Sequence, residues 1–104
     1  MKVAYIAGPY RASTPHGIVK NIRAAEAVSL KYWQQGFAVI CPHKNTALLD
    51  GVFSDTLWLE GGLTILSRCD TIIMMSGWEN SEGARKEHEF ALNHGIEIIY
   101  DYIQ

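Results

Sequence analysis

Four short apolar runs, each separated from the next by a stretch long enough for a helix, constrain the fold of this chain most strongly. They occupy residues 3–7, 37–41, 71–75 and 96–100. Runs of this length with little polar interruption are typical of strands buried on both faces, as in parallel sheets. Because parallel strands need crossover connections, the alternation predicts an α/β fold: a small doubly wound (Rossmann- or flavodoxin-like) parallel sheet of four to five strands, with helices on both faces.

Length and composition indicate one globular domain that spans residues 1–104. Apolar residues make up 48% of the chain and charged residues 19%, a balance that separates it from disordered sequences. The formal net charge of −2 provides no basic surface for a nucleic acid polymer, and no apolar stretch is long enough to cross a membrane. We therefore expect a cytoplasmic protein whose ligand is a small molecule.

The first two helical stretches carry start and stop signals. Thr14 and Pro15 predict the start of the first helix, as cap and first helical residue, and Gly36 predicts its end. A second helix is expected after Asp55, softened by the glycines at 61–62 and ending by residue 68 or 69. The apolar stripe of the first helix contains Ile18, Ile22, Ala25, Ser29 and Tyr32, widened by Val19 and Trp33.

The third helix carries a carboxylate where an apolar residue is expected. It follows the strand at 71–75, and Asn80 or Ser81 can cap its start. Glu87 falls on the side that should pack against the sheet, where a carboxylate must be hydrogen-bonded in a cleft or shifted in pKa. The alternative is a helix rotated so that Glu87 lies at its solvated edge. At a repeat of 3.6 residues, the packing side collects Ala84, Glu87, His88, Ala91 and Gly95.

Ligands of doubly wound sheets bind beyond the carboxyl ends of the strands, and three turns of this chain are expected to converge there. These turns are residues 8–11, 42–45 and 76–83. Helix N-termini attract anions, which makes the start of the third helix a candidate site for a phosphate or a carboxylate. The candidate binding residues are Gly8, Pro9, Tyr10, Arg11, His43, Ser76, Trp78, Ser81, Gly83 and Ala84, and for Trp78 a role as a lid over the core is an equal alternative.

Neither a metal nor an organic cofactor is expected. Cys41 and His43 lie two residues apart, but no second pair at a zinc-like spacing accompanies them. The sequence contains neither the glycine fingerprint of dinucleotide-binding folds nor a P-loop. Cys41 and Cys69 are too few for a disulfide framework and are expected to be reduced and buried.

Three segments of the chain form a pattern that is known from one enzyme superfamily. They are Tyr-Ile-Ala-Gly-Pro-Tyr at residues 5–10, Cys-Asp at 69–70, and Gly-Trp-Glu-Asn-Ser-Glu-Gly-Ala-Arg-Lys-Glu at 77–87. The pattern resembles that of the nucleoside 2-deoxyribosyltransferase superfamily, in particular its short phage and bacterial branch. The 2′-deoxynucleoside 5′-phosphate N-hydrolases are relatives of this branch. The resemblance covers nearly the whole chain. Its most specific part is Ser-x-Gly-Ala-x-x-Glu at 81–87 together with Gly-Pro after the first strand.

The resemblance implies an N-glycosidase or deoxyribosyltransferase-like enzyme that acts on a nucleoside or a nucleoside 5′-monophosphate. By position, Glu87 is the nucleophile that forms a covalent glycosyl intermediate, and Tyr5 is the tyrosine whose hydroxyl positions that carboxylate. The other matches are Gly8 and Pro9 in the turn that lines the sugar site, and Ser81, Gly83 and Ala84 in the turn that receives a 5′-phosphate in the nucleotide hydrolases. Arg11 and His43 are expected phosphate or base contacts by location.

One position departs from the superfamily pattern. Characterised members carry an aspartate, eight residues before the position of Asp70, that moves the proton to or from the base, whereas this chain has Gly62 there. Asp55 and Glu60 are near enough in sequence to substitute. General acid help is typically worth ~10²- to 10⁴-fold. The alternative function is therefore a catalytically weak nucleotide-binding module that has lost its acid.

The resemblance also implies a homodimer or a higher homo-oligomer, because relatives build their sites across subunit contacts. The irregular segment 45–58 contains Leu48, Leu49, Val52, Phe53 and Leu57. Long apolar loops on small domains rarely stay exposed. We expect this segment to cover a partner's pocket, and the alternative is that it folds back onto its own core.

Overall fold

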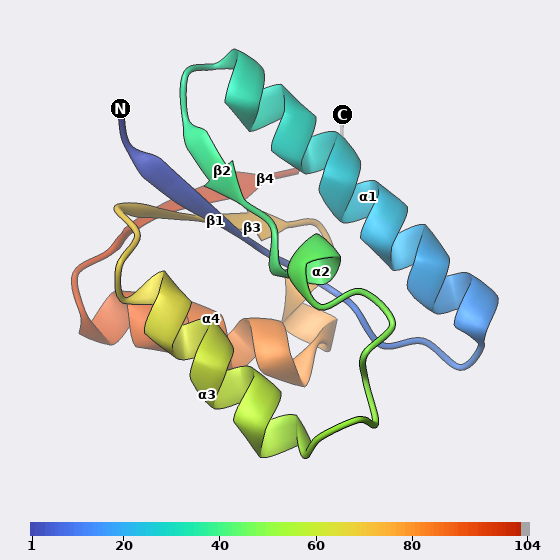
Figure 1. Ribbon diagram of the computed structural model, residues 1–104. Coiled ribbons are helices and arrows are strands. Elements are labelled where there is room, and N and C mark those ends of the chain that lie inside the picture. Colours follow the sequence, from blue (N-terminus) through green and yellow to red (C-terminus); the bar gives the residue numbers. More distant parts are fainter. Residues whose placement is uncertain (103–104) are drawn as a thin grey trace.

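The computed structural model describes residues 1–102 and contains one four-stranded sheet (Figure 1). The strands are β1 (Val3–Ala7), β2 (Ala38–Ile40), β3 (Thr71–Met75) and β4 (Glu97–Asp101). They lie in the order β2-β1-β3-β4, and every neighbouring pair is parallel. The predicted α/β fold with a parallel sheet is confirmed.

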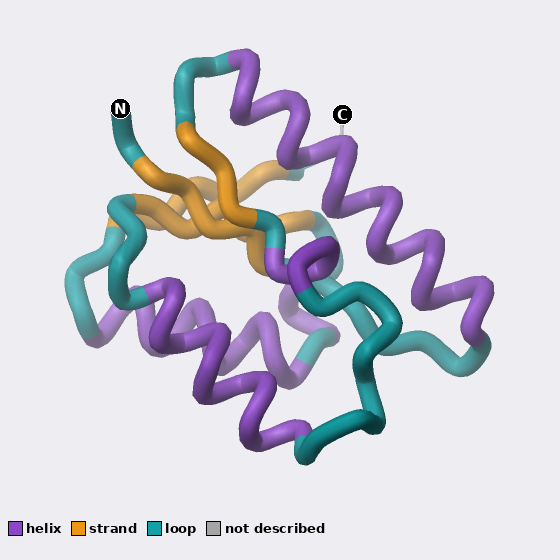
Figure 2. Tube along the Cα trace, in the orientation of Figure 1, coloured by secondary structure: helices purple, strands orange, loops and turns teal. Residues whose placement is uncertain are grey.

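Helices cover both faces of this sheet (Figure 1; Figure 2). α1 (Pro15–Gln34) lies on one face, and α3 (Asp55–Leu66) and α4 (Glu82–Asn93) lie on the other. A short helix, α2 (Pro42–Asn45), follows β2, and a 3-10 helix, η1 (Trp78–Asn80), links β3 to α4. Among the helices of residues 1–102, none combines the length and the apolar composition that spanning a bilayer requires.

The helix starts follow the signals in the sequence. The Thr14 hydroxyl accepts a hydrogen bond from the backbone N–H of Gly17 at 3.0 Å, and Pro15 stands in the first turn of α1. Ser54 and Ser81 cap α3 and α4 in the same way. Of the two predicted caps for α4, Ser81 is therefore the one that is used.

Three boundaries differ from those predicted. The stretch after β2 begins with α2, because the fixed φ of Pro42 suits the first turn of a helix. α3 runs through the glycines at 61–62 without a break and ends at Leu66. Each glycine costs the helix about 1 kcal/mol. The packing of Leu63 and Leu66 against the sheet offsets this cost. β2 is shorter than the apolar run at 37–41.

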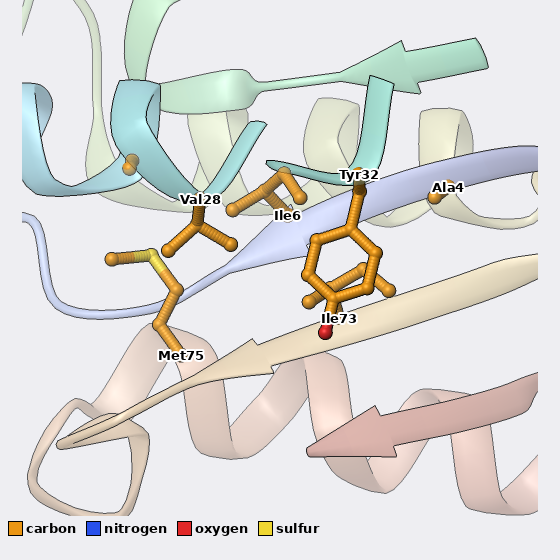
Figure 3. Packing of buried hydrophobic residues seen from close by; sticks show 7 residues of the cluster. Ala4, Ile6, Val28, Tyr32, Ile73 and Met75 are labelled. Atoms are coloured by element: carbon orange, nitrogen blue, oxygen red, sulfur yellow. The ribbon is translucent and has the colours of Figure 1, made fainter. Parts of the chain in front are cut away.

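The face of the sheet toward α1 forms one hydrophobic cluster (Figure 3). Figure 3 shows Val28 and Tyr32 of α1 over Ile6 of β1 and over Ile73 and Met75 of β3. All five side chains are at most 9% exposed. This cluster fixes α1 against the sheet and leaves the opposite face for α3 and α4.

Two expectations about burial were wrong. Val19 and Trp33 are 39% and 52% exposed, because they lie on the flank of the buried stripe of α1, and Val28 is buried in their place. Cys41 and Cys69 are free thiols but only partly buried, since each lies just outside the strand or helix that it was expected to join.

The face toward α3 and α4 brings Tyr5 to the candidate site. Because side chains alternate along a strand, Tyr5 and Ala7 point to this face while Ile6 points to α1. Ala84 and Ala91 of α4 are buried in the same cluster as Tyr5. The small side chains let α4 approach the sheet closely, so that a polar group on α4 can reach the end of the tyrosine.

Gly8 lets the turn after β1 pass close over β3. A Cβ at Gly8 would lie 2.6 Å from Met75 Sδ and 2.8 Å from Met75 Cβ. Any side chain here would move the end of β3. The turn that follows β1 therefore needs glycine at its first position.

Candidate active site

A cavity of about 480 Å³ opens beyond the carboxyl ends of the strands. Its wall includes residues from each of the three turns expected to converge, at 8–11, 42–45 and 76–83, and residues of α3 and of the segment before it. Of the predicted site residues, the cavity brings together Tyr5, Gly8, Pro9, Tyr10, Arg11, His43, Ser81, Gly83, Ala84 and Glu87.

Glu87 and Tyr5 meet at the wall of this cavity. The Tyr5 hydroxyl donates a hydrogen bond to Oε2 of Glu87. α4 presents its carboxylate here because Ala84 and Ala91, about one turn before and after it, are both buried against the sheet. Glu87 thus lies on the packed side of α4 and not at its solvated edge. Since Oε2 is held by the tyrosine, Oε1 is the oxygen available to a ligand.

Burial sets the protonation of both groups. Removal from water raises the pKa of Glu87 to about 7, and the hydrogen bond from Tyr5 opposes this rise. Burial, followed by the nearby charge of Glu87, raises the pKa of the Tyr5 phenol above its usual range. Tyr5 therefore remains a neutral donor, and Glu87 changes its charge near neutrality, as carboxylates of functional sites often do.

The raised pKa of Glu87 predicts a pH-dependent stability difference between the wild type and Glu87→Gln. Between the unfolded pKa of 4.5 and the folded pKa of about 7, the folded state holds a proton that the unfolded state has lost. Stability of the wild type therefore falls as pH rises through this window, whereas glutamine does not titrate. We expect the free energy of unfolding of Glu87→Gln, relative to that of the wild type, to be about 2 kcal/mol higher at pH 8 than at pH 5. Urea unfolding at the two pH values provides the measurement.

Glu89→Gln is the matched control, because Glu89 is on the same helix but exposed. Its stability relative to the wild type should be the same at both pH values. A Glu87→Gln difference that does not change between pH 5 and pH 8 would show that the Glu87 carboxyl titrates normally.

His43 of α2 fixes the turn after β1. Its Nε2 lies 2.8 Å from the carbonyl oxygen of Pro9, and because a carbonyl only accepts, this nitrogen carries the proton. Burial lowers the pKa of His43, although the backbone of Pro9 and Gly8 opposes the shift. His43 is therefore neutral at pH 7 and its ring meets that of Tyr10 edge-on at 5.7 Å.

Tyr10 ties segment 46–54, between α2 and α3, to the turn after β1. Figure 2 shows this segment as the long loop that leads into α3. The Tyr10 hydroxyl donates to Asp50 Oδ1 at 2.9 Å and accepts from the Leu48 backbone N–H at 2.9 Å. Leu48 has a φ of 62°, in the left-handed region that branched residues rarely adopt. Asp50 lines the cavity and was missed by sequence reasoning, whose only signal was the length of the loop around it.

Among residues 1–102, two cations line the cavity, and both are paired with carboxylates. Arg11 Nη2 lies 2.5 Å from Asp55 Oδ1, which raises the pKa of the guanidinium. Lys86 Nζ lies 3.1 Å from Glu82 Oε1, one turn back along α4, and lowers the pKa of that carboxyl. Both pairs are largely exposed, so they contribute little to folding. They do set the charge that a ligand meets.

A family model described as "Domain of unknown function (DUF4406)" matches residues 1–100. The chain belongs to the DUF4406 family. The family description names no activity, and none of the curated proteins matches this DUF4406 chain.

The fold of this DUF4406 protein is similar to that of a solved structure described as "2-desoxiribosyltransferase from Leishmania mexicana". The TM-score is 0.66 and the sequence identity is 17%. The match covers 100% of the DUF4406 chain and 66% of the Leishmania chain, so the DUF4406 chain spans about two thirds of that protein's length. The predicted likeness to the deoxyribosyltransferases is confirmed at the level of the fold.

Gly62 of α3 lies against the Tyr5–Glu87 pair. A Cβ at this position would stand 2.9 Å from the Tyr5 hydroxyl and 3.8 Å from Oε2 of Glu87. An aspartate here would require the Tyr5 hydroxyl to shift from its present position. Of the two carboxylates considered as substitutes, Asp55 lines the cavity and Glu60 does not.

Two predicted binding residues lie away from the cavity. Ser76 borders a second hollow, on the α1 side of the sheet, together with Lys31 of α1. Trp78 stacks on the His88 ring, with centroids 4.2 Å apart, and packs against the cluster under α3 and α4, as a lid over the core would. The tryptophan that lines the cavity is instead Trp58.

Proposed function

We propose that this DUF4406 protein is a nucleoside or nucleoside 5′-monophosphate N-glycosidase, or a deoxyribosyltransferase-like enzyme, that works through a covalent glycosyl–Glu87 intermediate. The observation that supports it is the Glu87 carboxylate at the cavity wall, held by the Tyr5 hydroxyl and with its pKa raised to about 7. A partly ionised, oriented carboxylate is suited to attack an electrophilic sugar carbon. The fold likeness to a deoxyribosyltransferase is in keeping with this chemistry.

In the first step, Oε1 of ionised Glu87 bonds to the anomeric carbon as the carbon–nitrogen bond to the base breaks. The electron pair leaves with the base, which takes up a proton from solvent, and the sugar passes through an oxocarbenium-like transition state. In the second step, water or another base attacks the same carbon and loses a proton to solvent, the bond from the sugar to Glu87 breaks, and the Glu87 carboxylate is restored. Tyr5 keeps its proton throughout and positions the carboxylate.

The second candidate function is a nucleotide-binding module with little or no catalysis. Gly62 favours it, because the position of α3 that holds the acid in characterised relatives has no side chain here. Without proton donation the base is a poor leaving group, and general acid help is typically worth ~10²- to 10⁴-fold. Such a module would keep the cavity and bind its ligand without consuming it.

The experiment that separates the two is chromatographic detection of free base after incubation with nucleosides, 2′-deoxynucleosides and their 5′-monophosphates. Release of base supports the glycosidase and identifies the base and the sugar. Thermal stabilisation by a nucleotide, with no base released over hours, supports the binding module. If none of the compounds is cleaved and none of them stabilises the fold, both functions are excluded.

We also infer that a second copy of this chain covers the cavity mouth. Five apolar side chains in and beside the segment that borders the cavity are 44–60% exposed, namely Leu48, Leu49, Val52, Phe53 and Leu57. Exposed apolar patches of this kind mark interaction surfaces. We expect light scattering to give twice the chain mass of 11.6 kDa, or a higher multiple of it. A monomer at micromolar concentration would contradict the inference.

A further inference from the structure

We infer, on the basis of the function proposed above, that the cavity selects an uncharged nucleoside over the corresponding 5′-monophosphate. The two compounds differ only at the 5′ position, where one has a hydroxyl and the other a phosphate. A phosphate monoester carries a charge of about −1.5 to −2 at pH 7. The charges and hydrogen-bond donors around the cavity therefore decide between them.

Carboxylates outnumber cations around the cavity. Among the described residues, four carboxylates line it, from Asp50, Asp55, Glu82 and Glu87, and two cations, from Arg11 and Lys86. A dianionic phosphate is repelled by such a wall, more strongly in a partly enclosed site than in bulk water.

Both cations already have a carboxylate partner. Arg11 is 2.5 Å from Asp55, and Lys86 is 3.1 Å from Glu82. A phosphate could displace either carboxylate, since exposed ion pairs are weak. The displaced carboxylate would then stand beside the bound phosphate, so the exchange would leave an uncompensated negative charge in the cavity.

Two of the neutral donors near the cavity are already in use, whereas the buried indole N–H of Trp58 has no partner among the described residues. The Nε2–H of His43 is donated to the Pro9 carbonyl. At the N-terminus of α4, the backbone N–H of Ala84 donates to the Ser81 hydroxyl at 3.2 Å, and Glu82 stands in the first turn. The positive end of the α4 dipole is thus already met by a carboxylate of the chain. A 5′-hydroxyl, in contrast, can donate to these carboxylates.

The test compares kcat/KM of the wild type for 2′-deoxynucleosides and for their 5′-monophosphates. We expect a preference of about 30-fold or more for the nucleoside. Equal or better cleavage of the monophosphate would overturn the inference while leaving the glycosidase function in place. If no base is released, thermal shifts with the same pairs provide the comparison. The nucleoside is then expected to stabilise the fold more than the monophosphate does. The inference is overturned if the monophosphate stabilises the fold more, or if neither compound stabilises it.

Asp55→Asn tests the electrostatic cause. It removes one carboxylate and frees Arg11, so the monophosphate should gain about tenfold relative to the nucleoside. Glu60→Gln, on the same helix but outside the cavity lining, is the matched control and should leave the ratio unchanged. A ratio that stays the same in Asp55→Asn would contradict the proposed origin of the selectivity.

Discussion

Glu87→Gln is expected to lower kcat/KM for base release by about 10³-fold or more, because an amide oxygen is a far weaker nucleophile than a carboxylate toward the anomeric carbon. The amide keeps the shape of the side chain and can still accept the hydrogen bond from Tyr5. The variant should therefore remain folded, with a ligand affinity close to that of the wild type. Initial rates of base release at pH 8, where Glu87 of the wild type is mostly ionised, provide the measurement.

The control for this loss is Glu89→Gln, which removes a carboxylate from the exposed side of the same helix. Its rate should match that of the wild type. If Glu87→Gln retains the wild-type rate while circular dichroism shows an intact fold, Glu87 does not take part in the chemistry.

Tyr5→Phe is expected to lower kcat/KM at pH 7 by about 10- to 100-fold, the usual worth of a hydrogen bond to a charged group. The nucleophile works when ionised, so activity rises with pH through the pKa of Glu87, which is about 7 in the wild type. The hydrogen bond from Tyr5 lowers that pKa. Without it the pKa rises, and the ascending limb of the pH profile moves to higher pH.

Tyr32→Phe is a matched control for this shift. The Tyr32 hydroxyl also donates to a carboxylate, Asp101 Oδ1 at 2.9 Å, but the pair lies outside the cavity lining. Its pH profile should coincide with that of the wild type. A Tyr5→Phe profile with an unchanged midpoint would mean that Tyr5 does not control the ionisation of Glu87.

The fold was predictable because its signals are local in the sequence. Buried parallel strands appear as short apolar runs, and the caps at Thr14 and Ser81 mark where helices begin. The boundaries that were mispredicted depend on contacts distant in sequence. α3 passes through two glycines because Leu63 and Leu66 are packed beneath the sheet, which local propensity does not report.

The site was predictable only in part. Glu87 could be identified because a carboxylate among small residues breaks the pattern of a packed helix face. Asp50 could not, since segment 46–54 has no period and its place depends on the hydrogen bond to Tyr10. Ser76 was assigned to the cavity from its position after β3, but a residue just beyond a strand can lie on either side of a sheet. The contact between Gly62 and Tyr5 joins elements that no local pattern connects.

The central claim is that Glu87 becomes covalently attached to the sugar, and mass spectrometry of its peptide tests this most directly. A nucleoside with fluorine at C2′ serves as the probe, because fluorine withdraws electrons from the oxocarbenium-like transition state and slows hydrolysis of the ester. After acid quenching and proteolysis, we expect the peptide that contains Glu87 to gain the mass of one fluoropentosyl group in the wild type and none in Glu87→Gln. Base release with an unmodified Glu87 peptide, or with the sugar on another carboxylate such as Asp50, would contradict the proposed mechanism.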